Sequence, residues 1–343
     1  MIQRAHKIKL KPTKVQETLL KQAAGTARFV YNWGLEKWEK MYRDGEKCTW
    51  IYLSSLWTQE RPDWAKGVTR TLQTQALNHL GGAYRAFFEK RAQHPTKKKK
   101  GRHDSFAVGG DKYAFSGRRI RLPRIGRVKM LEDFRYKNYR QLAATVSREA
   151  DGWYVSIQCE IPDDRPTPPE SVVGVDVGIK CWAIASDGTK IDPTKKLKHL
   201  RRILAKRQRL LARKQKGSNN YIKAANKVAR TYQTIRRISQ DAIHKFTTNL
   251  AKNHSVIVVE DLNVKGMKKS KIKGIRRGIQ YSEMSEIITL LEYKALRLVK
   301  VPMFYPSSKT CSNCGNVLAP HRACTKCGYY KGKSAIKVKE ENK

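Results

Sequence analysis

The balance of charge constrains this chain more than any other feature of its sequence. Its 343 residues include 72 Lys and Arg against 29 Asp and Glu, a formal net charge of +43 at pH 7. A compact surface this basic repels itself at low salt unless an anionic partner neutralises it. Hydrophobic residues make up 40% of the chain, enough to build a core, so it is not a disordered basic tail. We therefore expect a folded protein whose partner is a long polyanion such as nucleic acid.

Cysteine content and the N-terminal sequence indicate the compartment. Seven cysteines are an odd number, which disfavours a disulfide scaffold and favours the reducing cytoplasm. No run approaches eighteen apolar residues, so we expect no transmembrane helix and no membrane partner. The first residues, from Met1 to Lys7, lack the apolar stretch of a secretory signal. These observations predict a cytoplasmic protein.

The first half of the chain is predicted to be a β-domain interrupted by helices. Residues 2–10 alternate enough for a strand. Apolar residues then recur at three- and four-residue steps, first after an N-cap at Thr13 and again over 69–92, which predicts a helical domain at 13–95. Beyond a solvated lysine tract at 97–100, alternation and glycine-containing turns predict strands over 104–161. We expect the first strand to pair with these later strands in one barrel around the helical insertion.

The second half alternates strands and helices, so the fold class is α+β with several domains. The proline-rich segment 162–169 reads as a linker. Beyond it, the pattern predicts an apolar strand at 172–178 with a hairpin return at 182–185, and two basic helices over 195–252 with a break at 216–220. A second apolar strand follows at 255–260, then a helix at 281–297, a strand at 299–305 and a cysteine-rich tail at 311–328.

Four cysteines near the C-terminus have the spacing of a zinc site. They form two CxxC pairs, Cys311 with Cys314 and Cys324 with Cys327, separated by nine residues. Four thiolates in this arrangement can fill the tetrahedral shell of a structural Zn²⁺ ion. The alternatives are four unrelated buried cysteines or a redox pair. The basic neighbours favour a zinc ribbon with no catalytic role.

Two carboxylates mark the apolar strands. Asp176 lies on the first strand and Glu260 ends the second, and both strands look too apolar to accommodate an unpartnered charge. In a ribonuclease H-like sheet, carboxylates from separate strands converge on two Mg²⁺ ions that bind phosphate oxygens. The alternative is that each carboxylate hydrogen-bonds to neighbouring backbone.

The basic helical region at 195–252 favours nucleic acid as the polyanion. It holds eighteen Lys and Arg and one acidic residue, Asp241. Such a region would repel itself without phosphate nearby, although basic helices are often only solvated faces. The polar residues opposite the apolar stripe of the helix at 69–92 either contact nucleic acid or form an ordinary solvated face. The candidate nucleic-acid contacts are Arg70, Thr74, Asn78, Lys97, Lys98, Arg102, Arg201, Arg202, Lys206, Arg207 and Arg213.

Over nearly its whole length the chain resembles the TnpB family, the transposon-encoded RNA-guided nucleases related to type V CRISPR effectors. The resemblance is carried by residues 9–13 (KLKPT), 174–180 (GVDVGIK), 258–267 (VVEDLNVKGM) and 306–315 (PSSKTCSNCG). It implies four domains: a wedge β-barrel, a helical recognition insertion, a RuvC-like domain and a zinc ribbon. Their expected ranges are 1–12 with 96–165, 13–95, 166–306 with 330–343, and 307–329.

The resemblance also implies partners and site roles. A guide RNA encoded near the gene would direct the protein to double-stranded DNA beside a short adjacent motif. This would take place at the nucleoid of a prokaryotic cell. Asp176 and Glu260 would be two of the RuvC carboxylates, and the four cysteines would hold structural Zn²⁺.

One feature of the family is missing. The family has a third RuvC carboxylate shortly after the last zinc cysteine, which falls around Gly332, but no Asp or Glu lies between Glu292 and Glu340. Loss of one ligand should leave little or no Mg²⁺ binding and lower cleavage by orders of magnitude. The sequence therefore predicts a nuclease-dead protein similar to the TnpB-like repressors called TldR. Such a protein forms an R-loop at a guide-matched promoter and represses transcription without cutting.

Two other functions stay open. An active RNA-guided DNA endonuclease would need Glu340, Glu341 or another group to replace the missing ligand. An unguided nucleic-acid-binding remnant of a transposon would co-purify with mixed cellular RNA instead of one discrete RNA.

Overall fold

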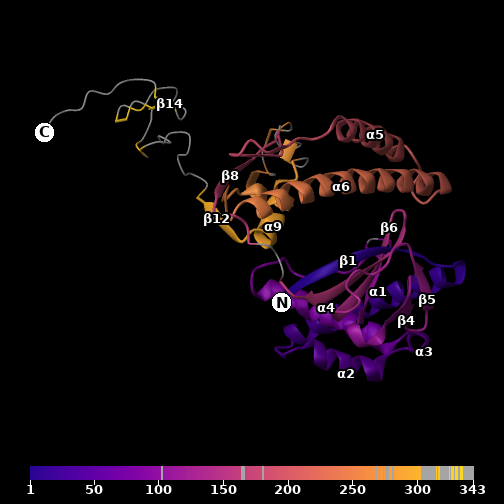
Figure 1. Ribbon diagram of the computed structural model, residues 1–343. Coiled ribbons are helices and arrows are strands. Elements are labelled where there is room, and N and C mark those ends of the chain that lie inside the picture. The colour runs from indigo at the N-terminus through magenta and orange to yellow at the C-terminus, as the bar shows by residue number, and fades with distance from the viewer. Residues whose placement is uncertain are drawn as a thin grey trace. The chain divides into compact units, whose positions relative to one another are not determined.

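The chain divides into two compact units, Met1–Arg165 and Pro166–Lys343 (Figure 1). The computed structural model describes residues 1–101, 103–163, 167–179, 181–267, 269, 271–272, 274, 278–279 and 282–302, and in the C-terminal segment residues 314, 316, 324, 326–327, 329–330 and 333–334. None of the helices in this described part combines the length and the apolar character needed to span a bilayer.

The first unit is built on a seven-stranded antiparallel sheet. Its strands are β1 (Ile2–Lys11), β2 (Ser105–Gly109), β3 (Ala114–Ser116), β4 (Arg119–Leu122), β5 (Gly126–Met130), β6 (Arg140–Glu149) and β7 (Gly152–Ile161), in the order β2-β6-β7-β1-β5-β4-β3. Strand β1 pairs with β7 from Ile2↔Ile161 onward and then with β5 at Leu10↔Met130. The expected pairing of the first strand with the later ones is therefore confirmed. Strands β2 and β3 end the hydrogen-bonded order, and closure into a barrel stays a prediction.

Four helices lie between β1 and β2. They are α1 (Lys14–Arg43), α2 (Trp50–Glu60), α3 (Asp63–Lys66) and α4 (Arg70–Phe88). Helix α1 begins with a capping box: the Gln16 N–H donates to Thr13 Oγ1 at 3.3 Å, and the Thr13 N–H donates to Gln16 Oε1 at 3.1 Å. Thr13 is thus the N-cap of α1, as predicted from its position just before the helical pattern of apolar residues.

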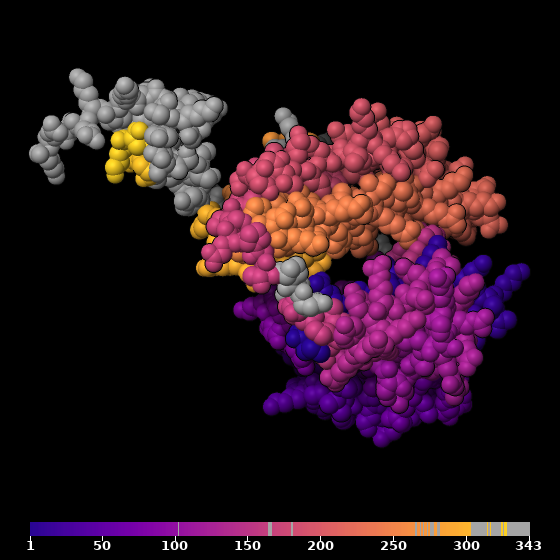
Figure 2. Space-filling view, in the orientation of Figure 1, coloured from indigo at the N-terminus to yellow at the C-terminus, as the bar shows by residue number. Residues whose placement is uncertain are grey.

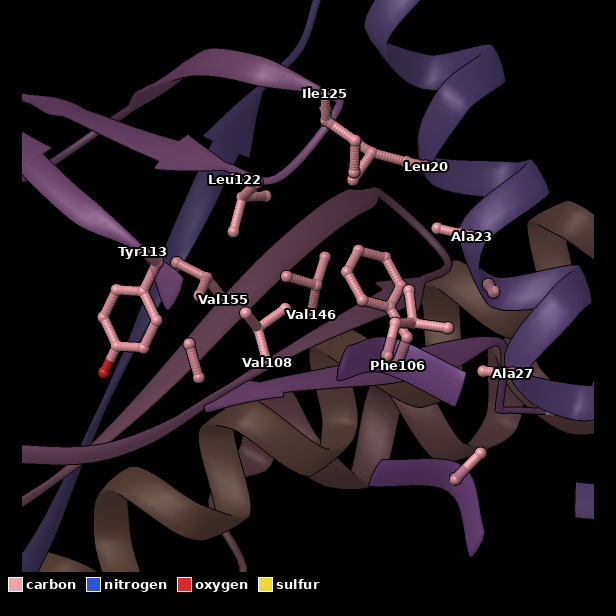
Figure 3. Packing of buried hydrophobic residues seen from close by; sticks show 14 of the residues in the cluster. Leu20, Ala23, Ala27, Phe106, Val108, Tyr113, Leu122, Ile125, Val146 and Val155 are labelled. Carbon is pink, nitrogen blue, oxygen red and sulfur yellow. The ribbon is translucent and has the colours of Figure 1, made fainter. Parts of the chain in front are cut away.

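Helix α1 packs on the sheet through small and branched side chains. Leu20, Ala23 and Ala27 face Phe106 and Val146 in one buried cluster (Figure 3). Helix α4 buries a wider stripe than its periodicity indicated, because it packs against both α1 and α2. Leu72, Ala76 and Leu80 are buried as expected, whereas Ala83 and Phe87 are only half-buried, and Gln73, Leu77 and Tyr84 join the core.

The second unit contains a five-stranded sheet. Its strands are β8 (Val172–Val177), β9 (Ala183–Ala185), β10 (Lys190–Ile191), β11 (Val256–Glu260) and β12 (Arg297–Val301), in the order β10-β9-β8-β11-β12. Strand β11 is parallel to both β8 and β12, and β9 returns antiparallel to β8. The predicted hairpin return is therefore confirmed. The last strand begins at Arg297, earlier than the predicted position 299.

The helices that the structure describes in this unit are α5 (Lys195–Ala212), α6 (Asn219–Asn253), α7 (Val264–Met267) and α9 (Met284–Lys294). Helices α5 and α6 lie side by side (Figure 2). The break between them, residues 213–218, overlaps the predicted 216–220 but begins earlier. Helix α9 is shorter than the predicted 281–297. One face of the sheet is buried under α6 and α9, where Val175 and Val259 join a cluster with Ile243, Phe246 and Ile287.

Candidate functional site

Asp176 and Glu260 occupy matching positions on neighbouring parallel strands. The register pairs Val258 with Gly174 and Val259 with Val175, so Glu260 and Asp176 are the next residues along β11 and β8. Val175 and Val259 point into the core, and the alternation of a strand turns the next residue to the opposite face. The two carboxylates therefore share one face at the carboxyl edge of the sheet, where open parallel sheets bind their ligands.

The expectation that these two charges would be buried is wrong. Asp176 is exposed and Glu260 is half-buried, because each strand buries only every second residue. The apolar run concealed this alternation, since valines occupy both faces of β8 and β11. The alternative, in which neighbouring backbone satisfies the carboxylates, is also not observed. Within the described residues, neither side chain makes a hydrogen bond or an ion pair.

A cavity of about 510 Å³ lies over the two carboxylates. Its lining includes Gly174, Asp176, Ile184, Ser186, Val258, Glu260, Val301 and Pro302. Gly174 keeps the space open, because a Cβ there would meet nothing within 4 Å. Ser186, whose Oγ accepts the Gly174 N–H at 3.1 Å, was not foreseen, and its only sequence signal is its place after the hairpin return.

The donor set fits a hard divalent cation. Carboxylate oxygens are the ligands that Mg²⁺ prefers, and these two are uncommitted and face open space. A two-metal centre needs further ligands, and the sequence between Glu292 and Glu340 supplies no carboxylate. Asp176 and Glu260 are therefore the two carboxylates that this cavity offers to a cation.

A hairpin occupies the stretch where the third carboxylate was expected. Strand β13 (Tyr329–Tyr330) pairs antiparallel with β14 (Lys333–Ser334) in a two-stranded sheet separate from the five-stranded sheet. Gly332 itself lies outside the described residues. The backbone on both sides of it therefore belongs to the small hairpin that follows the cysteines.

Three of the four predicted zinc ligands come together. The Sγ atoms of Cys314, Cys324 and Cys327 all lie within 4.8 Å of one another, and those of Cys314 and Cys324 are 3.5 Å apart. Cys311 lies outside the described residues. Burial alone would raise the pKa of the Cys324 thiol, but hydrogen bonds from the backbone N–H groups of Cys327 and Lys326, and from the neighbouring thiols, lower it. A thiolate-stabilising cluster of this kind suits a structural Zn²⁺ ion.

The candidate contacts on α4 form part of a polar surface with α2. Arg70 Nη2 donates to Thr58 Oγ1 at 2.9 Å, and Thr74 Oγ1 lies 3.5 Å from Ser54 Oγ. Asn78 is exposed. A cavity of about 360 Å³ beside Arg70 is lined by residues of both helices. The surface is open to a partner, and its contact with DNA stays a prediction.

The lysine tract is more ordered than a solvated linker. Lys97 forms an ion pair with Glu36, and Lys98 Nζ lies 3.9 Å from the centroid of the Tyr31 ring. Asn32 also fixes the backbone: its Oδ1 accepts the Lys98 N–H at 2.8 Å and its Nδ2 donates to the Lys98 carbonyl at 3.0 Å. These contacts attach the tract to α1. Arg102 lies outside the described residues.

The five candidates on and after α5 separate into two groups. Arg201 lies 5.6 Å from the Trp182 ring, and Arg207 donates to Thr231 Oγ1 and, at 3.4 Å, to the Lys227 carbonyl of α6. Both therefore act within the fold. The other three, Arg202, Lys206 and Arg213, are exposed and available to phosphate.

Comparison with proteins of known sequence identifies the family of this chain. The chain is 34% identical over 347 residues to the Escherichia coli (strain K12) protein named "Putative RNA-guided DNA endonuclease InsQ", which covers 93% of this chain and 85% of that protein. It belongs to the TnpB/OrfB-IS605 family. The OrfB-IS605 model, described as "Probable transposase", matches residues 156–271. A Streptomyces pristinaespiralis protein named "Putative RNA-guided DNA endonuclease" is 32% identical over 333 residues, covering 92% of this chain and 81% of that one. The expected family resemblance is thus confirmed.

The fold and the two ends of the chain have their own matches. The chain in the "Cryo-EM structure of the Cas12f1-sgRNA-target DNA complex" superposes with a TM-score of 0.57 at 13% identity, covering 95% of this chain and 96% of that one, so the two share a fold. A helix-turn-helix model of the family matches residues 1–47, although here they form strand β1 and the single helix α1. Residues 305–338 match the ribosomal L32p protein family. The large ribosomal subunit protein bL32 of Thermotoga maritima is 43% identical over 47 residues, covering 14% of this chain and 70% of that protein.

Proposed function

We propose that this chain is an RNA-guided protein that targets DNA and cuts it at a metal centre built on Asp176 and Glu260. The observation that carries this proposal is the pairing of two uncommitted carboxylates at the carboxyl edge of a parallel sheet, over an open cavity. Relatives named RNA-guided DNA endonucleases support the guide and the substrate. The net charge of +43 supports an extended polyanionic partner.

The described residues divide the work of this function. Asp176 and Glu260 hold the cation, and a bound Mg²⁺ would supply positive charge to the phosphate oxygens of the DNA. Exposed Arg202, Lys206 and Arg213 contact phosphate and so set position and salt dependence. Base pairing with the guide reads the sequence, while the protein reads the short adjacent motif. The cysteine cluster keeps its segment folded and takes no part in the chemistry.

A second candidate is guided DNA binding without cleavage, which would repress transcription by holding an R-loop over a promoter. Three observations favour it. No acidic residue lies between Glu292 and Glu340, strands 329–330 and 333–334 pair with each other in a separate small sheet, and the model matching residues 305–338 belongs to a ribosomal protein family. Glu340 and Glu341, the only later acids, lie outside the described residues.

One experiment separates these functions. The chain is co-expressed with its native flanking DNA, the complex is purified, and its RNA is sequenced. A plasmid library with the matched target and randomised flanks is then added with Mg²⁺, and retention and cleavage are scored together. The double variant Asp176→Asn, Glu260→Gln serves as the uncut reference.

Each outcome has a distinct meaning. Linear plasmid from the wild type, but not from the double variant, supports the endonuclease. Plasmid that is retained uncut with a flank preference supports the guided repressor. Ribosomal or mixed RNA without target retention overturns both and leaves an unguided RNA-binding protein, for which the bL32 likeness of the C-terminal segment makes ribosomal RNA the specific expectation.

A further inference from the structure

An aromatic groove lies where the ends of α1 and α4 meet in the first unit. Its volume is about 480 Å³, and its lining includes Tyr42, Arg43, Tyr84, Phe87, Phe88 and His94. Two of these rings are unusually exposed for their size, since Tyr42 is 67% and Phe88 is 54% accessible. Their centroids are 6.4 Å apart. Both therefore leave aromatic surface accessible in the groove.

Tyr84 forms the floor of the groove and carries an unsatisfied hydroxyl. Its ring is 3% accessible and stacks on Trp38 at a centroid distance of 4.3 Å and on Phe88 at 6.0 Å. Its buried hydroxyl has no hydrogen-bond partner in the part of the chain that the structure describes. Burial raises the pKa of Tyr84, with Glu39 adding to the effect, so the hydroxyl stays a donor at neutral pH. A buried donor without an acceptor is costly, and a ligand acceptor would relieve that cost.

The rim of the groove supplies further polar groups. His94 lies edge-on to both Tyr84 and Phe87, and its Nδ1 donates to the Pro95 carbonyl at 2.8 Å, so the Nε2 of the neutral ring is an acceptor. Arg43 provides a guanidinium and Glu39 a carboxylate. The groove thus offers flat aromatic surfaces together with both donors and acceptors.

These features select a flat, polar-edged ring. A nucleobase has this shape and edge chemistry, and stacking on exposed aromatic side chains is how proteins bind unpaired bases. A base inside a duplex cannot enter, because both of its faces are covered. The last turn of α1 carries Lys40 and Arg43, and Lys90 follows α4, whereas Arg91 is paired with Glu89 and the groove lining itself includes Glu39.

We propose that this groove binds an unpaired base of the guide RNA, stacked on Phe88 and hydrogen-bonded by the Tyr84 hydroxyl. This inference rests on the proposed function, which supplies the guide. Loops of a folded RNA present unpaired bases at all times, and RNA recognition is concentrated on them. The bases of a DNA target are paired until the strands are opened, so they reach the groove only after the guide has bound.

The test uses the full chain and the RNA that co-purifies with it. Phe88→Ala removes the stacking surface, and Tyr84→Phe removes only the hydroxyl. Tyr52→Ala is the matched control, since Tyr52 lies in the same unit and is 51% accessible. Affinity for the labelled RNA is measured for each variant, ultraviolet cross-links are mapped by mass spectrometry, and melting temperatures check that each variant is folded.

We expect Phe88→Ala to weaken RNA binding roughly tenfold and Tyr84→Phe several-fold, with Tyr52→Ala unchanged. Cross-links are expected on peptides that contain Tyr42 or Phe88. Wild-type affinity in folded Phe88→Ala overturns the inference and leaves the proposed function intact, as do cross-links from this groove to a displaced DNA strand alone. Absence of any discrete co-purifying RNA overturns the proposed function and the inference together.

Discussion

Asp176 and Glu260 each follow the last aligned pair of strands β8 and β11, Val175 and Val259, and share the exposed face of the sheet. Within the described residues no cation is paired with either carboxylate, and both line one cavity. The fold therefore places two uncommitted oxygen donors on one face of the sheet, and oxygen donors are the ligands that a hard divalent cation prefers.

Neutralising either carboxylate should lower DNA cleavage without lowering the melting temperature of the protein. Asp176→Asn or Glu260→Gln is expected to lower metal-dependent cleavage at least a hundredfold, because the remaining carboxylate binds Mg²⁺ poorly. The same variants should keep the melting temperature in EDTA, since neither carboxylate has a hydrogen bond or ion pair within the described residues to lose. Asp241→Asn, which alters an exposed acid paired with Lys245, is the control. A large fall in melting temperature would mean that the carboxylates are structural.

The cysteine cluster should hold one zinc ion per chain. Cys324→Ser is expected to remove it and to expose the C-terminal segment to proteolysis, because a structural site contributes folding energy directly. Metal content is measured by atomic emission. Cys48→Ser should leave zinc unchanged, since burial raises the pKa of Cys48 to about 11 and keeps that thiol protonated. Equal zinc in both variants would rule out the cluster as the binding site.

Two helical glycines should respond oppositely to alanine. A Cβ at Gly34 would lie 2.6 Å from Leu77 Cδ2 and 3.0 Å from Leu80 Cδ2, so Gly34→Ala should destabilise the first unit by about 1–3 kcal/mol. At Gly82 a Cβ meets nothing within 4 Å, so Gly82→Ala should stabilise α4 by up to about 1 kcal/mol. Denaturant unfolding measures both. Similar effects at the two sites would contradict the packing of α1 on α4.

Acid should weaken the first unit through His6. Burial lowers the pKa of His6, with Arg135 adding to the effect, and Nδ1 accepts the Arg135 N–H at 3.4 Å, which requires an unprotonated nitrogen. Between the lowered folded pKa and the unfolded value of 6.5, the unfolded chain binds more protons, so stability falls as pH decreases through this window. The melting temperature of His6→Gln should therefore fall less than that of the wild type between pH 7.5 and 5. His199→Gln, at an exposed position, should follow the wild type.

Charge reversal on the α5 segment should change affinity without changing specificity. Replacing Arg202, Lys206 and Arg213 with Glu should weaken binding to all targets alike and reduce the slope of log affinity against log salt, because fewer counterions are released. Binding titrations at several salt concentrations on matched and altered targets measure both effects. A changed preference among targets would show that these side chains contact bases.

Local signals in the sequence predicted much of the fold. The Thr13 cap, the break between α5 and α6 and the CxxC spacing depend on residues close in the chain. The cap is confirmed, the break lies within a few residues of its predicted position, and three of the four cysteines come together. The partner of the first strand was also predicted correctly, although only as a consequence of alternating patterns.

Features set by distant contacts were not predictable. The exposure of Asp176 was missed because a run of valines does not reveal which face is covered. Arg207 was assigned to phosphate, yet it bonds to Thr231 on the next helix. The sequence also gives no signal for the burial of Gln73, whose amide accepts from Trp57 Nε1 and donates to two backbone carbonyls in the core. These outcomes depend on tertiary neighbours.

The central position of β1 determines when the first unit can be completed during synthesis. Ile2 pairs with Ile161, so the earliest strand to leave the ribosome waits for the last strand of the sheet. Before β7 is made, β1 can pair only with β5, and only through Leu10 and Lys11, so most of its hydrogen-bonding edges stay open to incorrect partners. Contacts this far apart in sequence slow folding. The first unit therefore cannot complete its sheet until residue 161 has been made.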